Sequence, residues 1–236
     1  MHIFVSDAHI RRDNDRSARM LGQFLRDMKT RMSQLYIVGD LFEFWFEYKS
    51  AVPKRYLRTL ATLCDIIENG IPIHYLLGNH EVMVGTYLEN AGFTIHREPT
   101  TFTIYGQRVL VAHGDKIDRR VWSTVWEYLL TSKINRSLYQ LFPPDIGIRI
   151  AQSVAALSRR RPFSADVSAS LEKYARMQLC NNDIVILGHS HIPAFAELIN
   201  KKYYINLGDW IGHFTYAAID AEKVVLERYN KQGTSF

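Results

Sequence analysis

Leu35-Tyr36-Ile37-Val38-Gly39-Asp40 is an apolar run that ends in a glycine and a carboxylate. Its four apolar residues, several of them strong β formers, predict a buried strand. Open α/β sheets bind their ligands just beyond the carboxyl ends of their strands, and Asp40 directly follows such an end. Because a carboxylate has two oxygens, Asp40 is placed to bridge two cations.

Four other expected strands also end in residues that can ligate a metal. They are followed by Asp7 and His9, by Asn79 and His80, by His113, and by His189 and His191. Oxygen and imidazole ligands without a thiolate suit Mn²⁺, Fe or Zn²⁺ better than Ca²⁺. Two such ions clamp a phosphoryl group and activate water. The residues therefore predict two divalent metal ions, Mn²⁺ before Fe or Zn²⁺, and hydrolysis of a phosphate ester or anhydride.

The order of the expected elements indicates the fold class. Strands are expected at residues 2–6, 35–38, 71–77, 101–105 and 108–112, with five more between 184 and 229, and helices at 14–30 and 53–70. The alternation of strands and helices in the first part predicts a parallel sheet with helical crossovers. The later strands are separated by turn-like clusters. We expect an α/β protein with two sheets packed face to face and helices outside.

Residues 116–176 look helical and interrupt the β series. This segment has 11 basic and five acidic residues, although the whole chain has a net charge of only +5. Its apolar residues recur at helical spacing, which fits either ordinary core or a lid with an apolar inner face. We divide the chain into a core, 1–115 and 177–236, and a helical lid insertion, 116–176. The charge predicts an anionic partner, with a solvated helical surface as the alternative.

The composition excludes several classes of protein. Nearly half of the 236 residues are apolar, so disorder is not expected. No run of about 18 apolar residues is present to span a membrane, and the chain enters a strand at once, without room for a signal peptide. Cys64 and Cys180 are expected to be reduced core residues of a cytoplasmic protein. Four histidines without motif partners are expected to be structural: His2, His74, His96 and His213.

The motifs together resemble one known family. They are Asp7-x-His9, Gly39-Asp40, Gly78-Asn79-His80-Glu81, His113 and Gly188-His189-Ser190-His191. This series is similar to the signature of the calcineurin-like metallophosphoesterases, and it implies a four-layer α/β-β/α sandwich. By the same resemblance, one metal is held by Asp7, His9, Asp40 and His191, and the other by Asp40, Asn79, His113 and His189. His80 lies near the leaving group and is steered by Glu81, and the catalytic residues are Asp40, Asn79 and His80.

A narrower resemblance is to the members of that family that act in lipid A synthesis. It rests on residues 39–45, on His113-Gly114-Asp115 and on the helical insertion before Gly188. It implies a nucleotide-linked glycolipid substrate, a UDP-linked diacylated glucosamine that is split at its pyrophosphate to release UMP. The implied location is the cytoplasm, peripheral on the inner membrane, with no nucleic acid and no obligate protein partner. Proteobacterial members have Gly-Asn-Arg-Asp where this chain has Gly-Asn-His-Glu.

Substrate contacts are expected from the insertion. The candidates are Asp118, Trp122, Ser158, Arg159, Arg160 and Arg161. A soluble phosphodiesterase or nucleotide hydrolase without a lipid substrate is the alternative in the same chemistry. A non-catalytic interaction module on this fold would be expected to have lost metal ligands, and none is lost. A nuclease is also open, although the basic charge lies among apolar stripes more than in a broad groove.

Overall fold

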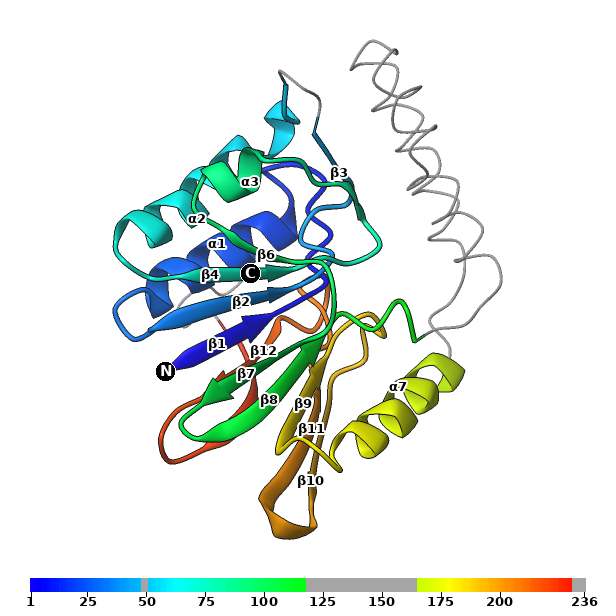
Figure 1. Ribbon diagram of the computed structural model, residues 1–236. Helices are drawn as coiled ribbons and strands as arrows, with labels where there is room; N and C mark the ends of the chain where they lie inside the picture. The colour runs from blue at the N-terminus through cyan, green and yellow to red at the C-terminus, as the bar shows by residue number, and fades with distance from the viewer. Residues whose placement is uncertain (48–50, 118–164, 231–236) are drawn as a thin grey trace.

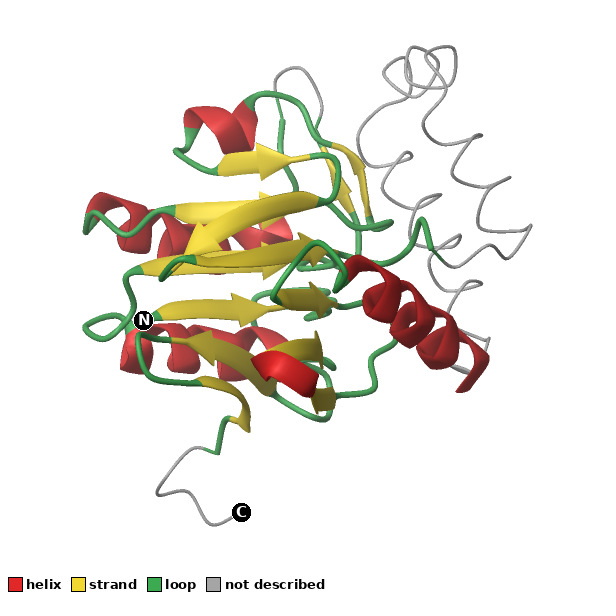
Figure 2. Ribbon diagram, turned by 60° about the horizontal axis from the view of Figure 1, so that its bottom comes forward, coloured by secondary structure: helices red, strands yellow, loops and turns green. Residues whose placement is uncertain are grey.

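The computed structural model describes residues 1–47, 51–117 and 165–230 of the chain. They form two main sheets that pack against each other, with helices on the outer faces (Figures 1 and 2). The expected α/β sandwich is therefore confirmed.

The first sheet has six strands in the order β13-β12-β1-β2-β4-β6. Their bounds are β1 His2–Val5, β2 Gln34–Val38, β4 Ile73–Leu76, β6 Thr94–His96, β12 Thr215–Ile219 and β13 Val224–Arg228. The strands β1, β2, β4 and β6 run parallel, whereas β12 pairs antiparallel with both β1 and β13. Thus the first strand of the chain lies between a strand from the N-terminal part and one from the C-terminal part.

The second sheet has five strands in the order β10-β11-β9-β8-β7. Their bounds are β7 Thr100–Ile104, β8 Gln107–Ala112, β9 Ile184–Leu187, β10 Ala194–Leu198 and β11 Lys202–Asn206. The central strands β11, β9 and β8 are parallel, and each edge strand joins by an antiparallel pair. The expected hairpin is β7–β8.

Three buried clusters separate four layers. The first lies between the first sheet and the helices α1 (Arg16–Met28) and α2 (Leu57–Glu68). The second lies between the two sheets, and the third lies between the second sheet and α7 (Ala165–Gln178). Asp15 caps α1 by accepting a hydrogen bond from the Ala18 N–H at 2.7 Å, which fixes where this helix begins.

Several short elements were not expected from the sequence. The strands β3 (Trp45–Phe46) and β5 (Glu81–Met83) pair with each other in a separate small ladder, and β6 extends the first sheet. Such strands of two or three residues are too short for a period to be visible. The helix expected from Pro53 begins instead with a 3₁₀ turn, Lys54–Tyr56, before α2, and a further short helix is α3, Tyr87–Asn90.

Most of the expected insertion lies outside the described residues. Its last part, 165–176, lies in α7, which packs on the second sheet, and the bounds of the insertion stay a prediction. Within the described ranges no helix is long and apolar enough to cross a bilayer. The expectation that both cysteines are core residues was wrong: Cys180 is exposed in the turn after α7, and Cys64 in α2 is only partly buried.

Three of the four histidines outside the motifs lie at the interface of the two sheets. His74 stacks on Tyr36 with ring centroids 4.9 Å apart, and its Nδ1 lies 3.1 Å from Nε2 of His96. Phe102 from the second sheet packs on both His74 and His96, and His2 contacts Tyr36. These three histidines are structural, as expected.

This interface predicts an acid-sensitive fold. Burial, with His96 and His2 nearby, lowers the pKa of His74 to about 4, below its ordinary value of about 6.5. The unfolded chain therefore binds the extra proton first, so the stability from neutral His74 is complete above pH 6.5 and is lost as the pH falls toward 4. In thermal melts with a chelator present, His74→Phe is expected to flatten the decline of Tm between pH 7 and pH 5. An unchanged slope would contradict this role of His74.

Candidate metal centre

The carboxyl ends of five strands converge at one edge of the two sheets (Figure 1). The loops after β1 and β2 are joined by hydrogen bonds from the Asp7 N–H to Gly39 O at 3.2 Å and from the His9 N–H to Asp40 O at 3.0 Å. The loops after β8 and β9 are joined by the Gly188 N–H, which donates to His113 O at 2.9 Å. The strand ends of both sheets thus contribute side chains to one site.

The first cluster consists of Asp7, His9 and His191, all of them buried or nearly so. Nε2 of His191 lies 3.3 Å from Oδ1 of Asp7 and 3.1 Å from Nε2 of His9. Nε2 of His9 lies 3.8 Å from the same carboxylate oxygen. One oxygen and two imidazole nitrogens therefore surround a common point, at spacings that suit one ion.

The second cluster consists of Asp40, His113 and His189. Oδ2 of Asp40 is 3.3 Å from Nε2 of His113 and also 3.6 Å from Nε2 of His9, which belongs to the first cluster. Asp40 thus faces both clusters. This position is the one that a bridging carboxylate needs.

Hydrogen bonds outside the clusters fix which ring nitrogen faces inward. The Nδ1–H of His113 donates to the Val38 carbonyl at 2.9 Å, so Nε2 is the ring nitrogen that faces Asp40. That Nε2 is buried and has no hydrogen-bond partner, and the same holds for Oδ1 of Asp7. Buried polar atoms are rarely left without partners. One such atom lies in each cluster, which fits one divalent ion at each.

Neighbouring charged groups at the site shift one another's pKa values. Burial raises the pKa of Asp40, but His113 and His80 outweigh it and hold this pKa well below its usual range. Burial lowers the pKa of His113, but Asp40 raises it well above its ordinary value. The pKa of His9 is lowered to about 4 by burial and by His80. Without metal the proton is therefore held on His113, and an ion that binds there must displace it.

The backbone at the site is strained. Asp7, His9, Asp40, His189 and His191 have φ values of 52°, 42°, 51°, 66° and 58°. Residues other than glycine rarely adopt this left-handed conformation, and such outliers cluster at functional sites. Gly78 permits the closest approach, because a Cβ there would lie 2.3 Å from Oδ1 of Asp40. The loops are shaped to direct side chains at a common centre, at a cost in local strain.

His80 lies at the border of the two clusters. Its Nδ1–H donates to the Glu43 carbonyl at 2.6 Å, and its Nε2 lies 3.9 Å from Oδ2 of Asp40. The expectation that Glu81 steers His80 was wrong. The buried Glu81 carboxylate instead accepts hydrogen bonds from the N–H groups of Asp40, Leu41 and Gly78 and from the Tyr75 hydroxyl. Glu81 therefore holds the loops after β2 and β4 together.

The expected roles of Asn79 and of the insertion residues stay predictions. The Asn79 side chain is exposed and makes no hydrogen bond within the described residues, so its role as a ligand stays a prediction. The expected substrate contacts Asp118, Trp122, Ser158, Arg159, Arg160 and Arg161 lie outside the described residues.

Asp209 was missed by the sequence analysis, although its signal was present. Leu207-Gly208-Asp209 follows β11 just as Val38-Gly39-Asp40 ends β2. Oδ2 of Asp209 lies 3.6 Å from Nδ1 of His191 and 3.2 Å from Nδ1 of His213. His213 shares this carboxylate with His191, and the expectation that His213 is structural stays a prediction.

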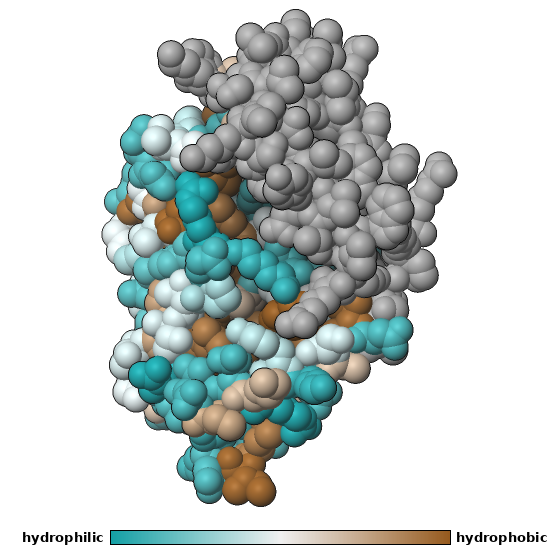
Figure 3. Space-filling model, turned by 45° about the vertical axis from the view of Figure 1, so that its right-hand side comes forward, coloured by the Kyte–Doolittle hydropathy of each residue, from teal (hydrophilic) through white to brown (hydrophobic). Residues whose placement is uncertain are grey.

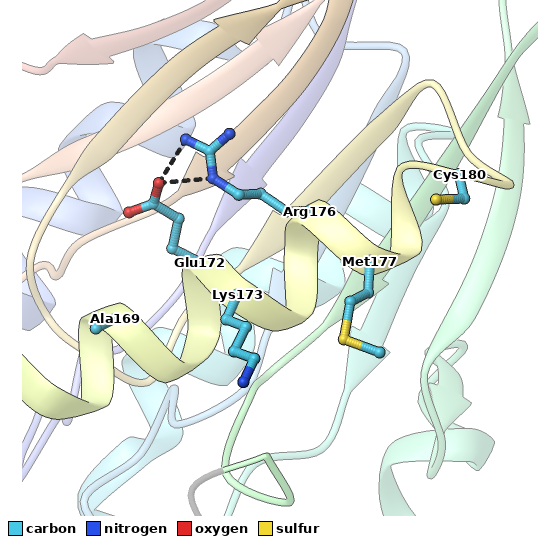
Figure 4. Close-up of a pocket in the computed structure, with 6 residues that line it drawn as sticks. All are labelled: Ala169, Glu172, Lys173, Arg176, Met177 and Cys180. Atoms are coloured by element: carbon cyan, nitrogen blue, oxygen red, sulfur yellow. Dashed lines mark hydrogen bonds and ion pairs between the residues drawn. The ribbon is translucent and has the colours of Figure 1, made fainter.

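A separate hollow lies on the outer face of α7 (Figure 4). It is lined by Ala169, Glu172, Lys173, Arg176, Met177 and Cys180. The Glu172 and Arg176 side chains pair at 2.7 Å, an ordinary ion pair one helical turn apart (Figure 4). None of these residues belongs to either cluster, so the hollow is not part of the candidate centre.

The chain is similar to known phosphoesterases. Residues 3–193 match the model of the calcineurin-like phosphoesterase family. A UDP-2,3-diacylglucosamine hydrolase of Porphyromonas gingivalis is 28% identical, with 95% of each chain covered. One of Escherichia coli is 25% identical over 95% of this chain and 97% of that protein. The solved structure of Yfce, a phosphoesterase from E. coli, has a TM-score of 0.48 and 16% identity, and covers 98% of this chain and 94% of that one.

Proposed function

Because this chain belongs to the calcineurin-like phosphoesterase family, we propose that it is a two-metal hydrolase that splits the pyrophosphate of UDP-2,3-diacylglucosamine. The products are UMP and 2,3-diacylglucosamine 1-phosphate. Water supplies the new oxygen, and the bridging P–O bond breaks. The observation that carries the proposal is the position of Asp40 between two clusters of imidazole and carboxylate groups.

The donor set supports two divalent ions. Asp7, His9 and His191 would hold one, His113 and His189 the other, and Asp40 would bridge them, with Asn79 completing the second site. Imidazole and carboxylate donors suit Mn²⁺, with Fe or Zn²⁺ as alternatives. When bound, such a pair polarises phosphoryl oxygens and lowers the pKa of water.

The chain's own residues carry the remaining chemistry. His80 is anchored through Nδ1 to Glu43, so its Nε2 faces the clusters and is available to give a proton to the leaving phosphate. The Glu81 clamp keeps the Asp40 and Gly78 loops at a fixed separation. Preorganisation of this kind lets a site act without rearrangement during the reaction.

The relatives and the surface beside the site support this substrate. Curated relatives over nearly the whole length carry the name UDP-2,3-diacylglucosamine hydrolase. Ile192, next to His191, is 41% exposed, and Ile211, near Asp209, is 46% exposed. On the side toward which the strands of the first sheet point, Figure 3 shows apolar patches between polar residues. Exposed apolar side chains beside the clusters suit acyl chains.

The proposed location follows from this substrate. A diacylated sugar nucleotide resides in a membrane, so the enzyme would work in the cytoplasm, peripherally on the inner membrane. The basic insertion 116–176 would contribute the anion-binding and membrane contacts, including Arg159, Arg160 and Arg161, at about 1 kcal/mol per charge near an anionic surface. No nucleic acid and no obligate protein partner are needed for this activity.

A release assay tests the proposal. Purified protein with Mn²⁺ is given UDP-2,3-diacylglucosamine in detergent micelles, and UMP is measured beside the hydrolysis of a simple aryl phosphodiester. We expect UMP release that is abolished by a chelator and that exceeds diester hydrolysis by at least about 10²-fold in kcat/KM. Hydrolysis of the aryl diester without UMP release would instead favour a soluble phosphodiesterase without a lipid substrate.

A further inference from the structure

The loop between β11 and β12 places a buried carboxylate behind the first cluster. Asp209 is only 6% exposed. Its Oδ1 accepts hydrogen bonds from the N–H groups of Ile211 at 3.0 Å, Gly212 at 2.8 Å and His213 at 3.0 Å. These three bonds fix the carboxylate and leave Oδ2 directed toward the imidazoles.

The His191 ring lies between Asp209 and the first cluster. On one side its Nδ1 faces Oδ2 of Asp209 at 3.6 Å. On the other side its Nε2 faces Oδ1 of Asp7 at 3.3 Å and Nε2 of His9 at 3.1 Å. The two ring nitrogens therefore have different partners, a carboxylate behind and the cluster in front.

The same loop is fastened to the strand-end loops on both sides. The Trp210 N–H donates to the Asp7 carbonyl at 3.1 Å, and the Trp210 side chain is fully buried. The Asn206 side-chain amide donates to Gly188 O at 2.8 Å, just before the loop with His189 and His191. Asp209 therefore has a fixed place relative to both Asp7 and His191.

Oδ2 of Asp209 is the carboxylate oxygen that faces Nδ1 of His191. A negative charge at Nδ1 favours the tautomer with the proton on Nδ1 and makes Nε2 a stronger donor.

We propose that Asp209 is a positioning residue that orients the His191 imidazole and strengthens Nε2 as a ligand for a divalent ion. Asp209 does not touch the ion and acts only through His191. His213 shares the carboxylate at 3.2 Å, but its side chain is half-exposed and it belongs to neither cluster. This inference rests on the proposed function, because it requires His191 to be a ligand.

Calorimetric titration of the metal-free protein with Mn²⁺ tests the proposal. Asp209→Asn keeps an oxygen for the three N–H groups but removes the charge. We expect the affinity of one of the two ions to fall about 10- to 100-fold, the range typical for partners of ligating histidines. The matched control is Asp220→Asn, because Oδ1 of Asp220 also accepts two loop N–H groups, from Glu222 and Lys223, but contacts no histidine. This control should bind Mn²⁺ like the unmodified chain.

A double variant shows whether Asp209 acts through His191. In a His191→Ala background, Asp209→Asn should change the remaining Mn²⁺ affinity by less than about twofold, since the coupling partner is gone. A full additional loss in that background would overturn the proposal, as would unchanged binding by Asp209→Asn alone. An unmodified chain that binds two Mn²⁺ ions but releases no UMP would count against the proposed substrate and leave the role of Asp209 intact. Failure of that chain to bind Mn²⁺ at all would overturn both.

Discussion

Asp40→Ala is expected to abolish hydrolysis and to lower the bound metal from two ions to one or none. Oδ2 of Asp40 lies 3.3 Å from His113 and 3.6 Å from His9, so its loss removes a charge from both clusters at once. Enzymes accelerate reactions by about 10⁶-fold or more, so a fall in kcat of at least about 10⁴-fold is expected. Turnover by UMP release and bound metal by elemental analysis are the two measurements.

The fold should survive this substitution. Asp40 accepts one backbone hydrogen bond, from the His80 N–H at 3.0 Å, whereas the Glu81 clamp that joins the same loops stays in place. Circular dichroism should therefore match the unmodified chain. Asp65→Ala, at an exposed carboxylate paired with Lys29, is the control and should keep both ions and full activity. An active Asp40→Ala protein with both ions retained would refute the bridging role.

His80→Ala is expected to lower kcat by about 10²–10⁴-fold and to leave metal content near normal. The motif places His80 beside the ligands, and a group that transfers or stabilises a proton at the leaving oxygen contributes a factor of this size. The geometry leaves a competing role open to test, because Nε2 of His80 also forms a group with His9 and Asp40 that is close enough to hold an ion.

Metal analysis separates the two roles. His9→Ala is the matched control, because His9 belongs to the first cluster and its loss should release an ion. If His80→Ala releases an ion as His9→Ala does, His80 is a ligand. If it keeps both ions and loses turnover, the proton-transfer role stands, and the pH profile of kcat should lose its basic limb.

The strand ends were predictable from sequence because buried strands leave a strong local signal. Apolar runs at residues 3–5 and 35–38 end where polar residues begin, and parallel strands bring such ends to one edge. The different roles of Glu81 and His80 could not be predicted from this signal. Both follow the same strand, and only the three-dimensional path of the loop sends the Glu81 carboxylate to the Asp40 backbone and the His80 ring to Glu43.

Other features depend on long-range packing that no local pattern contains. Asp209 could be recognised as a site residue only from its contact with His191, which lies on another loop. The pairing of β3 with β5 joins two segments that are too short to show a period in the sequence. Cys180 shows the opposite case. It follows the buried Leu179, but it lies in the turn after the end of α7 and is exposed.

The place of β1 in its sheet has a consequence for synthesis on the ribosome. β1 is translated long before its neighbour β12, with which it pairs through Ile3 and Ala218. At a synthesis rate of about 5–20 residues per second, one edge of β1 stays unpaired for roughly 10–40 s until β12 is made. During that time the growing chain exposes an unpaired, apolar strand edge, the kind of surface that invites wrong pairing. This exposure ends only when β12 has emerged and has paired with β1.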